Sequence, residues 1–317
     1  MSAEGGTKAV LAALTANLAI AIAKFGAFAV TGSTSMAAEG VHSLADSGNQ
    51  VLLLVGGKRS RRTATQEHPF GFGRARYVYA FIVSIVLFTL GGLFALYEGW
   101  HKVTHPEELN SLQWAIGVLI FAIVAESFSL RTAVKESNRV RGSARWVRFV
   151  RSNKSPELPV VLLEDVGALI GLVFALVGVS LAAITGNSRW DGLGSMAIGL
   201  LLVAIAVFLA IEMNSLLLGE AALPEHVAAI ESALVSGKVF TRVIHLRTLH
   251  LGPDEILVAA KVGVTREDSA ESIVSAIDAA ESQIRAAVPL TCVIYLEPDL
   301  YDLRNIDATG RAPSADA

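Results

Sequence analysis

The chain has 317 residues, of which 53% are hydrophobic and only 17% are charged, and its formal net charge is −3. Soluble domains carry roughly 25% charged residues, so this composition excludes a disordered or nucleic-acid-binding protein and argues against an ordinary soluble enzyme. The charge divides unevenly, because residues 1–218 hold 18 basic and 14 acidic side chains, whereas residues 219–317 hold 8 and 15. We therefore expect two pieces of different character. A single cysteine, Cys292, excludes an internal disulfide framework and a cysteine-based metal cage.

Six segments are long and apolar enough to cross a bilayer, which needs about 20 mostly apolar residues. They are residues 9–30, 35–57, 77–98, 112–131, 157–184 and 191–218. The first lacks the basic start and small-residue cleavage site of a signal peptide, so we expect a retained helix. The prediction for residues 1–218 is an all-α transmembrane domain of six helices.

The basic residues predict the orientation of these helices. The connections 58–76 and 131–154 are rich in Lys and Arg, whereas the other connections contain at most one such residue each. Cytoplasmic loops carry an excess of Lys and Arg. We therefore expect a multi-pass protein of the cell (inner) membrane with both termini and both basic connections in the cytoplasm.

After Gly219 the pattern becomes that of a small soluble domain. Pro224 is expected to open a helix, residues 240–250 and 255–264 to form strands around a Gly-Pro-Asp turn, and residues 268–288 to form a helix with Ser269 as its N-cap. A third strand at 291–297 completes an α-β-β-α-β domain over residues 219–306. The polar end, residues 307–317, is expected to be disordered.

Ionisable side chains inside the apolar segments are the candidate functional residues, because a charge at mid-bilayer costs roughly 2.5–3.5 kcal/mol. The second segment places four polar residues along one helical face: Glu39, His42, Asp46 and Asn49. The fifth contains Glu164 and Asp165. Imidazole and carboxylate groups from two facing helices could complete a four-coordinate site for a divalent metal ion. Glu39 and Glu164 could instead be solvated residues near helix ends.

Three further charged residues lie in or near the apolar segments: Lys24, Glu126 and Glu212. Lys24 is close enough to the outer end of its helix to extend its ammonium group to the interface. For all three we favour structural pairing over a role in transport.

An ordered set of motifs resembles the cation diffusion facilitator family, in its zinc-transporter-like branch. The set consists of Thr31-Gly32-Ser33-Thr34-Ser35, His42-Ser43-Leu44-Ala45-Asp46, His68-Pro69-Phe70-Gly71-Phe72-Gly73-Arg74, Glu164-Asp165 and the α-β-β-α-β tail. The resemblance runs from about Lys8 to Pro298. It implies a homodimeric transporter that exports Zn²⁺ or a related divalent ion in exchange for protons, with a ferredoxin-like cytoplasmic domain.

The resemblance assigns the transport site to His42, Asp46 and Asp165. The family's fourth ligand falls on Val161, which cannot bind a metal ion. Glu164, Asn49, Glu39 or a water molecule could fill that position. The loop metal site of the family keeps His68 but has Phe72 in place of a second His. The tail site has Tyr295 and Glu297 at its last-strand positions, so metal binding by the tail is in doubt.

The proposed chemistry is exchange of a metal ion for protons, because imidazole and carboxylate ligands must lose protons to bind a cation. A mixed N/O ligand set favours Zn²⁺, while Mn²⁺, Fe²⁺, Co²⁺ and Ni²⁺ remain alternatives. No prosthetic group is expected. A membrane enzyme is disfavoured because no Ser or Cys nucleophile and no H-E-x-x-H pattern accompanies these residues. A metal-binding membrane protein without transport activity is the alternative from another class.

Overall fold

The computed structural model describes residues 2–32, 34–106, 112–237 and 239–300. The predicted tail at 307–317, together with residues 301–306, lies outside the described residues. The described chain divides into two compact units, with the boundary between Leu217 and Leu218. Each is considered by itself below.

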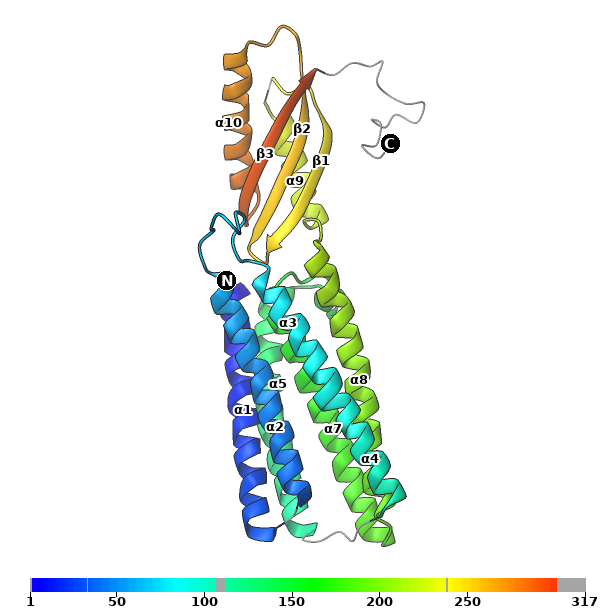
Figure 1. The fold of residues 1–317 in the computed structure, drawn as a ribbon. Helices are drawn as coiled ribbons and strands as arrows, with labels where there is room; N and C mark the ends of the chain where they lie inside the picture. Colours follow the sequence, from blue (N-terminus) through cyan, green and yellow to red (C-terminus); the bar gives the residue numbers. More distant parts are fainter. Residues whose placement is uncertain (1, 33, 107–111, 238, 301–317) are drawn as a thin grey trace, which may run out of the picture. The chain divides into compact units, whose positions relative to one another are not determined.

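The first unit consists of long helices (Figure 1). They are α1 (Ser2–Thr31), α2 (Thr34–Ser60), α3 (Ala75–Val86), a π-helical turn η1 (Leu87–Leu93), α4 (Phe94–Thr104), α5 (Leu112–Arg141), the short α6 (Trp146–Ser152), α7 (Glu157–Thr185) and α8 (Arg189–Leu218). α3, η1 and α4 follow one another without a break and form one continuous helical segment. The predicted segments thus coincide with helices, although α5 runs ten residues past the predicted end at residue 131.

Five helical segments are long and apolar enough to cross a membrane, counted over the described residues: Gly5–Thr31, Ala75–Thr104, Gln113–Arg141, Glu157–Thr185 and Arg189–Leu218. α2 has 27 residues but is not among them. Its sequence carries Glu39, His42, Asp46, Asn49 and Gln50 between its apolar residues, and these lower its mean hydropathy. The helix that departs from the apolar pattern is therefore the one richest in candidate site residues.

Glycines allow α8 to approach the segment formed by η1 and α4 closely. A Cβ atom added at Gly99 would lie 2.6 Å from the backbone nitrogen of Met196 and 2.7 Å from the carbonyl oxygen of Gly192. A Cβ at Gly199 would lie 2.7 Å from the backbone nitrogen of Leu96. Small residues commonly permit such backbone contact between membrane helices.

The second unit is a three-stranded sheet with two helices, α9 (Pro224–Val235) and α10 (Ala270–Ala287). β1 (Arg242–Gly252) pairs antiparallel with β2 (Glu255–Val264), which pairs parallel with β3 (Thr291–Leu300). Alternate β2 residues, from Ile256 to Val262, are buried against Ile230 of α9 and Ile284 of α10. Because alternate residues share one face of a strand, both helices cover the same face of the sheet.

Two details of this unit match the sequence analysis. Ser269 is the N-cap of α10, and its side chain accepts a hydrogen bond from the backbone N–H of Ser272. Pro224 occupies the first turn of α9, where its missing N–H costs no hydrogen bond.

The helix contact at Gly99 leads to a stability prediction. Gly99→Ala should lower the free energy of unfolding by about 1–3 kcal/mol, because the new methyl group meets backbone atoms that cannot rotate away. Thermal melting of the detergent-solubilised protein measures the effect. Gly117→Ala on α5 is the matched control, since a Cβ there meets no atom within 4 Å. Equal melting temperatures for the two variants would contradict the close packing of α4 and α8.

Candidate metal transport site

One cavity inside the helical unit collects most of the ionisable side chains identified in the sequence. Residues of α1, α2, α5 and α7 line it, together with residues of the η1–α4 segment and α8. Its ionisable lining residues are Lys24, Glu39, His42, Asp46, Glu98, Lys102, Glu126, Glu164, Asp165 and Asp191. Asn49 of the predicted set is absent from this lining. The cavity therefore brings acids, one imidazole and two lysines together among membrane helices.

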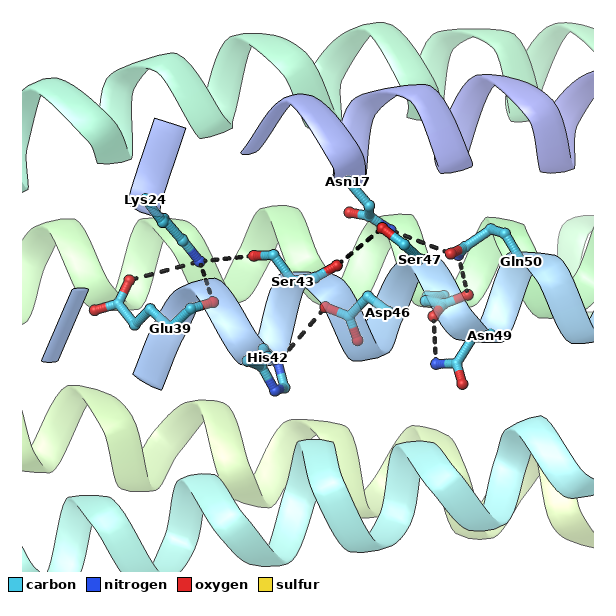
Figure 2. A network of polar contacts seen from close by, with 10 residues as sticks. Asn17, Lys24, Glu39, His42, Ser43, Asp46, Ser47, Asn49 and Gln50 are labelled. Carbon is cyan, nitrogen blue, oxygen red and sulfur yellow. Dashed lines mark hydrogen bonds and ion pairs between the residues drawn. The ribbon is translucent and has the colours of Figure 1, made fainter. Parts of the chain in front are cut away.

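His42 and Asp46 form the part of the site that the sequence predicts most directly. They lie one turn apart on α2, and His42 Nε2 is 3.7 Å from Asp46 Oδ2 (Figure 2). Both side chains line the cavity and are partly exposed, at 28% and 23% of their surface. The spacing of four residues places an imidazole nitrogen and a carboxylate oxygen side by side, as a shared metal ion would require.

Lys24 of α1 is buried and does not extend to the interface. Its ammonium group donates a hydrogen bond to Ser43 Oγ at 3.0 Å and lies 3.5 Å from Glu39 Oε2 (Figure 2). This contact supplies the structural pairing that the sequence analysis favoured for Lys24. The Glu39 carboxylate is therefore paired with this cation.

Asn49 and Glu164 belong to a separate hydrogen-bonded group that joins α2 to α7. Asn49 Nδ2 donates to Glu164 Oε1 and Gln50 Nε2 donates to Glu164 Oε2, each at 3.0 Å. Asn17 of α1 donates to Gln50 Oε1 at 3.4 Å (Figure 2). Gln50 and Asn17 were missed in the sequence analysis, although a Gln directly after Asn49 in a membrane helix was a visible signal. Both oxygens of Glu164 thus accept amide hydrogen bonds.

Asp165 is held from a third helix. Ser129 of α5 donates a hydrogen bond to Asp165 Oδ2 at 2.7 Å, and both residues are buried. Ser129 was also missed, because a lone Ser on an apolar helix gives no distinctive sequence signal. This hydrogen bond fixes the orientation of the Asp165 carboxylate and leaves oxygen lone pairs for another partner.

A second charged group lines the same cavity at α4 and α8. Lys102 Nζ lies 3.0 Å from Glu98 Oε1 and 3.1 Å from Asp191 Oδ2. The spacing of four residues between Glu98 and Lys102 is a sequence signal for this pair. Glu212 of α8, by contrast, has the predicted structural partner, since Arg151 lies 3.6 Å from it.

No three His, Cys, Asp or Glu side chains among the described residues lie close enough together to hold a metal ion in this conformation. The proposed ligand set of His42, Asp46 and Asp165 therefore remains a prediction. The structure places all three on one cavity, pairs the first two, and gives Glu39, Asn49 and Glu164 other polar partners.

Residues at or near the other family metal positions have structural contacts. His68 packs edge-on against Phe72, with ring centroids 4.6 Å apart. In the second unit, Lys261 contacts Glu297 at 3.0 Å and Asp299 at 2.9 Å, and its hydrogen bond lowers the pKa of Asp299 below the usual value. His250 is buried within the sheet, and its Nδ1 lies 3.1 Å from the carbonyl oxygen of Gly252.

The fold and cavity define a multi-pass helical membrane protein with ionisable groups inside its helical unit. The cation efflux transmembrane domain model matches residues 10–218. The chain therefore belongs to the cation efflux family, the cation diffusion facilitators, as the sequence motifs predict.

Similar proteins of this family are transporters by name. The chain is 33% identical over 265 residues to a mitochondrial proton-coupled zinc antiporter, SLC30A9, of Xenopus laevis. The aligned residues make up 83% of this chain and 47% of that relative. It is 34% identical over 263 residues to the human protein of that name, and the alignment covers 82% of this chain and 46% of that protein. It is 24% identical over 257 residues to the manganese efflux system protein MneP of Bacillus subtilis, and the alignment covers 79% of this chain and 81% of that protein. The chain spans about half the length of the two antiporters.

The amide contacts of Glu164 lead to a prediction about its structural role. Gln50→Leu should lower the free energy of unfolding by about 1–3 kcal/mol, because a buried carboxylate oxygen loses its donor. The double variant Gln50→Leu/Glu164→Leu should recover part of this loss, since no carboxylate is left. Thermal melting in detergent measures both, with Val51→Leu at the neighbouring exposed position as control. Additive losses in the double variant would show that the two side chains do not depend on each other.

Proposed function

We propose that this protein exports a divalent metal cation from the cytoplasm, with Zn²⁺ as the favoured substrate, in exchange for protons. The observation that carries the proposal is the shared cavity, which His42 and Asp46 of α2 and Asp165 of α7 line together within membrane helices. A charged or ionisable group in such a place is costly, so its presence there indicates a function. The names of the zinc antiporter relatives support the same activity.

We assign metal binding to His42, Asp46 and Asp165. The short separation of His42 from Asp46 and the single hydrogen bond on Asp165 support this assignment. Glu164 and Asn49 are assigned a supporting role, because they bond to each other across α2 and α7. Glu39 is assigned to the Lys24 ion pair. Binding would draw the ligands on the two helices toward the ion, which links occupancy to helix position.

Proton exchange follows from the chemistry of these ligands. Imidazole and carboxylate groups bind a cation only when deprotonated, so metal entry releases protons and protonation expels the metal. A proton gradient directed into the cytoplasm would then favour metal release on the outer side. No resident cofactor is needed for this exchange, because the metal ion is the transported substrate.

The identity of the metal is the less specific part of the proposal. One imidazole among carboxylates favours Zn²⁺ over Mg²⁺ and Ca²⁺, which prefer oxygen ligands alone. Transport of Mn²⁺, Fe²⁺, Co²⁺ or Ni²⁺ is the alternative. Because the chain is similar to a protein named as a manganese efflux system, Mn²⁺ should be among the ions that are tested as competitors of Zn²⁺ uptake.

We further propose the setting in which this activity occurs. α2 would also cross the membrane, which brings the five segments described above to six spans. Its polar face lines the cavity, and its 27 residues are enough to cross a bilayer. Residues 219–306 would form a ferredoxin-like cytoplasmic domain, and the protein would act as a homodimer in the inner membrane.

The transport proposal predicts the effect of removing single ligands. His42→Ala and Asp165→Asn should each abolish Zn²⁺ uptake into inside-out vesicles that carry an imposed pH gradient, because each removes a ligand. His101→Ala is the matched control, since His101 lies on the exposed side of α4 and outside the cavity lining. Collapse of the gradient should stop uptake by the unaltered protein. Unchanged uptake in His42→Ala would refute the assigned site, and metal binding without any uptake would favour a metal-binding protein that does not transport.

The proposed orientation, with both termini and both basic connections in the cytoplasm, predicts from which side of the membrane two loops are accessible. On a Cys292→Ser background, Arg62→Cys should react with a membrane-impermeant thiol reagent only from the cytoplasmic side, and Asn187→Cys only from the outside. Both positions are exposed, and Cys292 is the only natural cysteine. Labelling of intact cells against inside-out vesicles measures the difference. The reverse pattern would invert the proposed direction of transport.

A further inference from the structure

Glu126 of α5 is a buried acid to which neither the sequence motifs nor the proposed site gives a role. Only 5% of its surface is exposed, and it lines the same cavity as His42, Asp46 and Asp165. From its place in the sequence we expect a structural partner for it. In the described part of the chain, its carboxylate has neither a hydrogen bond nor an ion pair, unlike that of Glu212, which contacts Arg151.

Two of the proposed metal ligands are anionic neighbours of Glu126. Asp46 and Asp165 line the same cavity, as does the cation Lys24. One turn further along α5, Ser129 donates to Asp165, so the same face of α5 is directed at the α7 acid. Lys24 is already committed to Glu39 and Ser43, so it does not balance the three acids.

A divalent cation would offset the negative charge that these three acids leave unbalanced in the cavity. Several carboxylates that share a buried site repel one another, and either a bound proton or a bound metal ion can relieve that repulsion. Glu164 is less suited to complete the site, because amide groups from α2 already bond to both of its oxygens. Val161, the position implied by the family resemblance, has no donor atom. Glu126 has a free carboxylate directed into the cavity from a third helix.

We propose that Glu126 is the fourth protein ligand of the transported metal ion, so that α5 joins α2 and α7 in forming the site. The resulting set is one imidazole nitrogen and three carboxylate groups, from His42, Asp46, Asp165 and Glu126, which suits a four-coordinate transition-metal ion. This inference rests on the proposed function of the cavity. It also makes the metal affinity depend on α5, a helix that the motif-based assignment leaves out.

The first test is metal binding by the purified full-length protein at fixed pH. Zn²⁺ affinity is measured by competition with a fluorescent chelator. Glu126→Gln should weaken binding by at least about tenfold, because changes to groups that merely orient a ligand already cost 10–100-fold. Glu212→Gln is the matched control, an acid of a membrane helix that does not line the cavity, and it should bind as the unaltered protein does. Melting temperatures establish that each variant is folded.

A second variant separates a ligand from a structural residue. Glu126→His should retain metal binding and shift the ratio of Zn²⁺ to Mn²⁺ affinity toward Zn²⁺, because imidazole prefers Zn²⁺ more strongly than a carboxylate does. A residue that only supports the helices would leave that ratio unchanged. This comparison also decides the question if Glu126→Gln fails to fold.

The outcomes distinguish this inference from the proposed function. If His42→Ala and Asp165→Asn weaken Zn²⁺ binding while Glu126→Gln does not, Glu126 is not a ligand and the three-residue site stands. An unchanged Zn²⁺ to Mn²⁺ ratio in Glu126→His would likewise exclude Glu126 as a ligand. If none of the His42, Asp165 and Glu126 variants weakens binding, the cavity is not the metal site and the proposed function itself fails.

Discussion

The cost of isolating a charge from water governs how the helical unit is built. Arg76 and Glu157, both almost completely buried, stand 2.9 Å apart and link the beginnings of α3 and α7. Lys24 and Lys102 likewise have carboxylates within 3.5 Å. Removing one member of such a pair would leave an uncompensated buried charge, which is far more costly than losing both. The ionic contacts therefore hold specific helices in specific positions.

Among the described residues, three acids on the cavity lack an ion pair with Lys or Arg: Asp46, Asp165 and Glu126. Asp46 instead faces the His42 imidazole. In the proposed function, such a site would attract cations because its own charges are only partly balanced. Protons and metal ions would then compete for the same groups, which is the physical basis of the proposed exchange. Glu164, held by two amides, lies beside the site and connects its two principal helices.

Sequence reasoning was most successful where local spacing determines geometry. The four-residue interval of His42 and Asp46 predicted their contact, and Ser269 was recognised as an N-cap because capping depends only on neighbouring residues. The short helix α6 was missed, since its residues lie in a basic stretch that was read as a connection. The contacts of Lys24 with Glu39 and of Ser129 with Asp165 depend on how separate helices are rotated against each other. Neither composition nor periodicity of a single helix contains that information.

The π-helical turn η1 has a consequence for the residues that follow it. A π turn accommodates an extra residue, and each residue of an α-helix corresponds to about 100° of rotation. The face that α4 presents is therefore offset from the one that α3 would continue without η1. With this offset Glu98 and Lys102 line the cavity, while Gly91 within η1 leaves room near the His42 ring. The rotation of α4 about the helix axis is thus set separately from that of α3. Deleting one residue within η1 would rotate α4, with Glu98 and Lys102, without changing the sequence of α4.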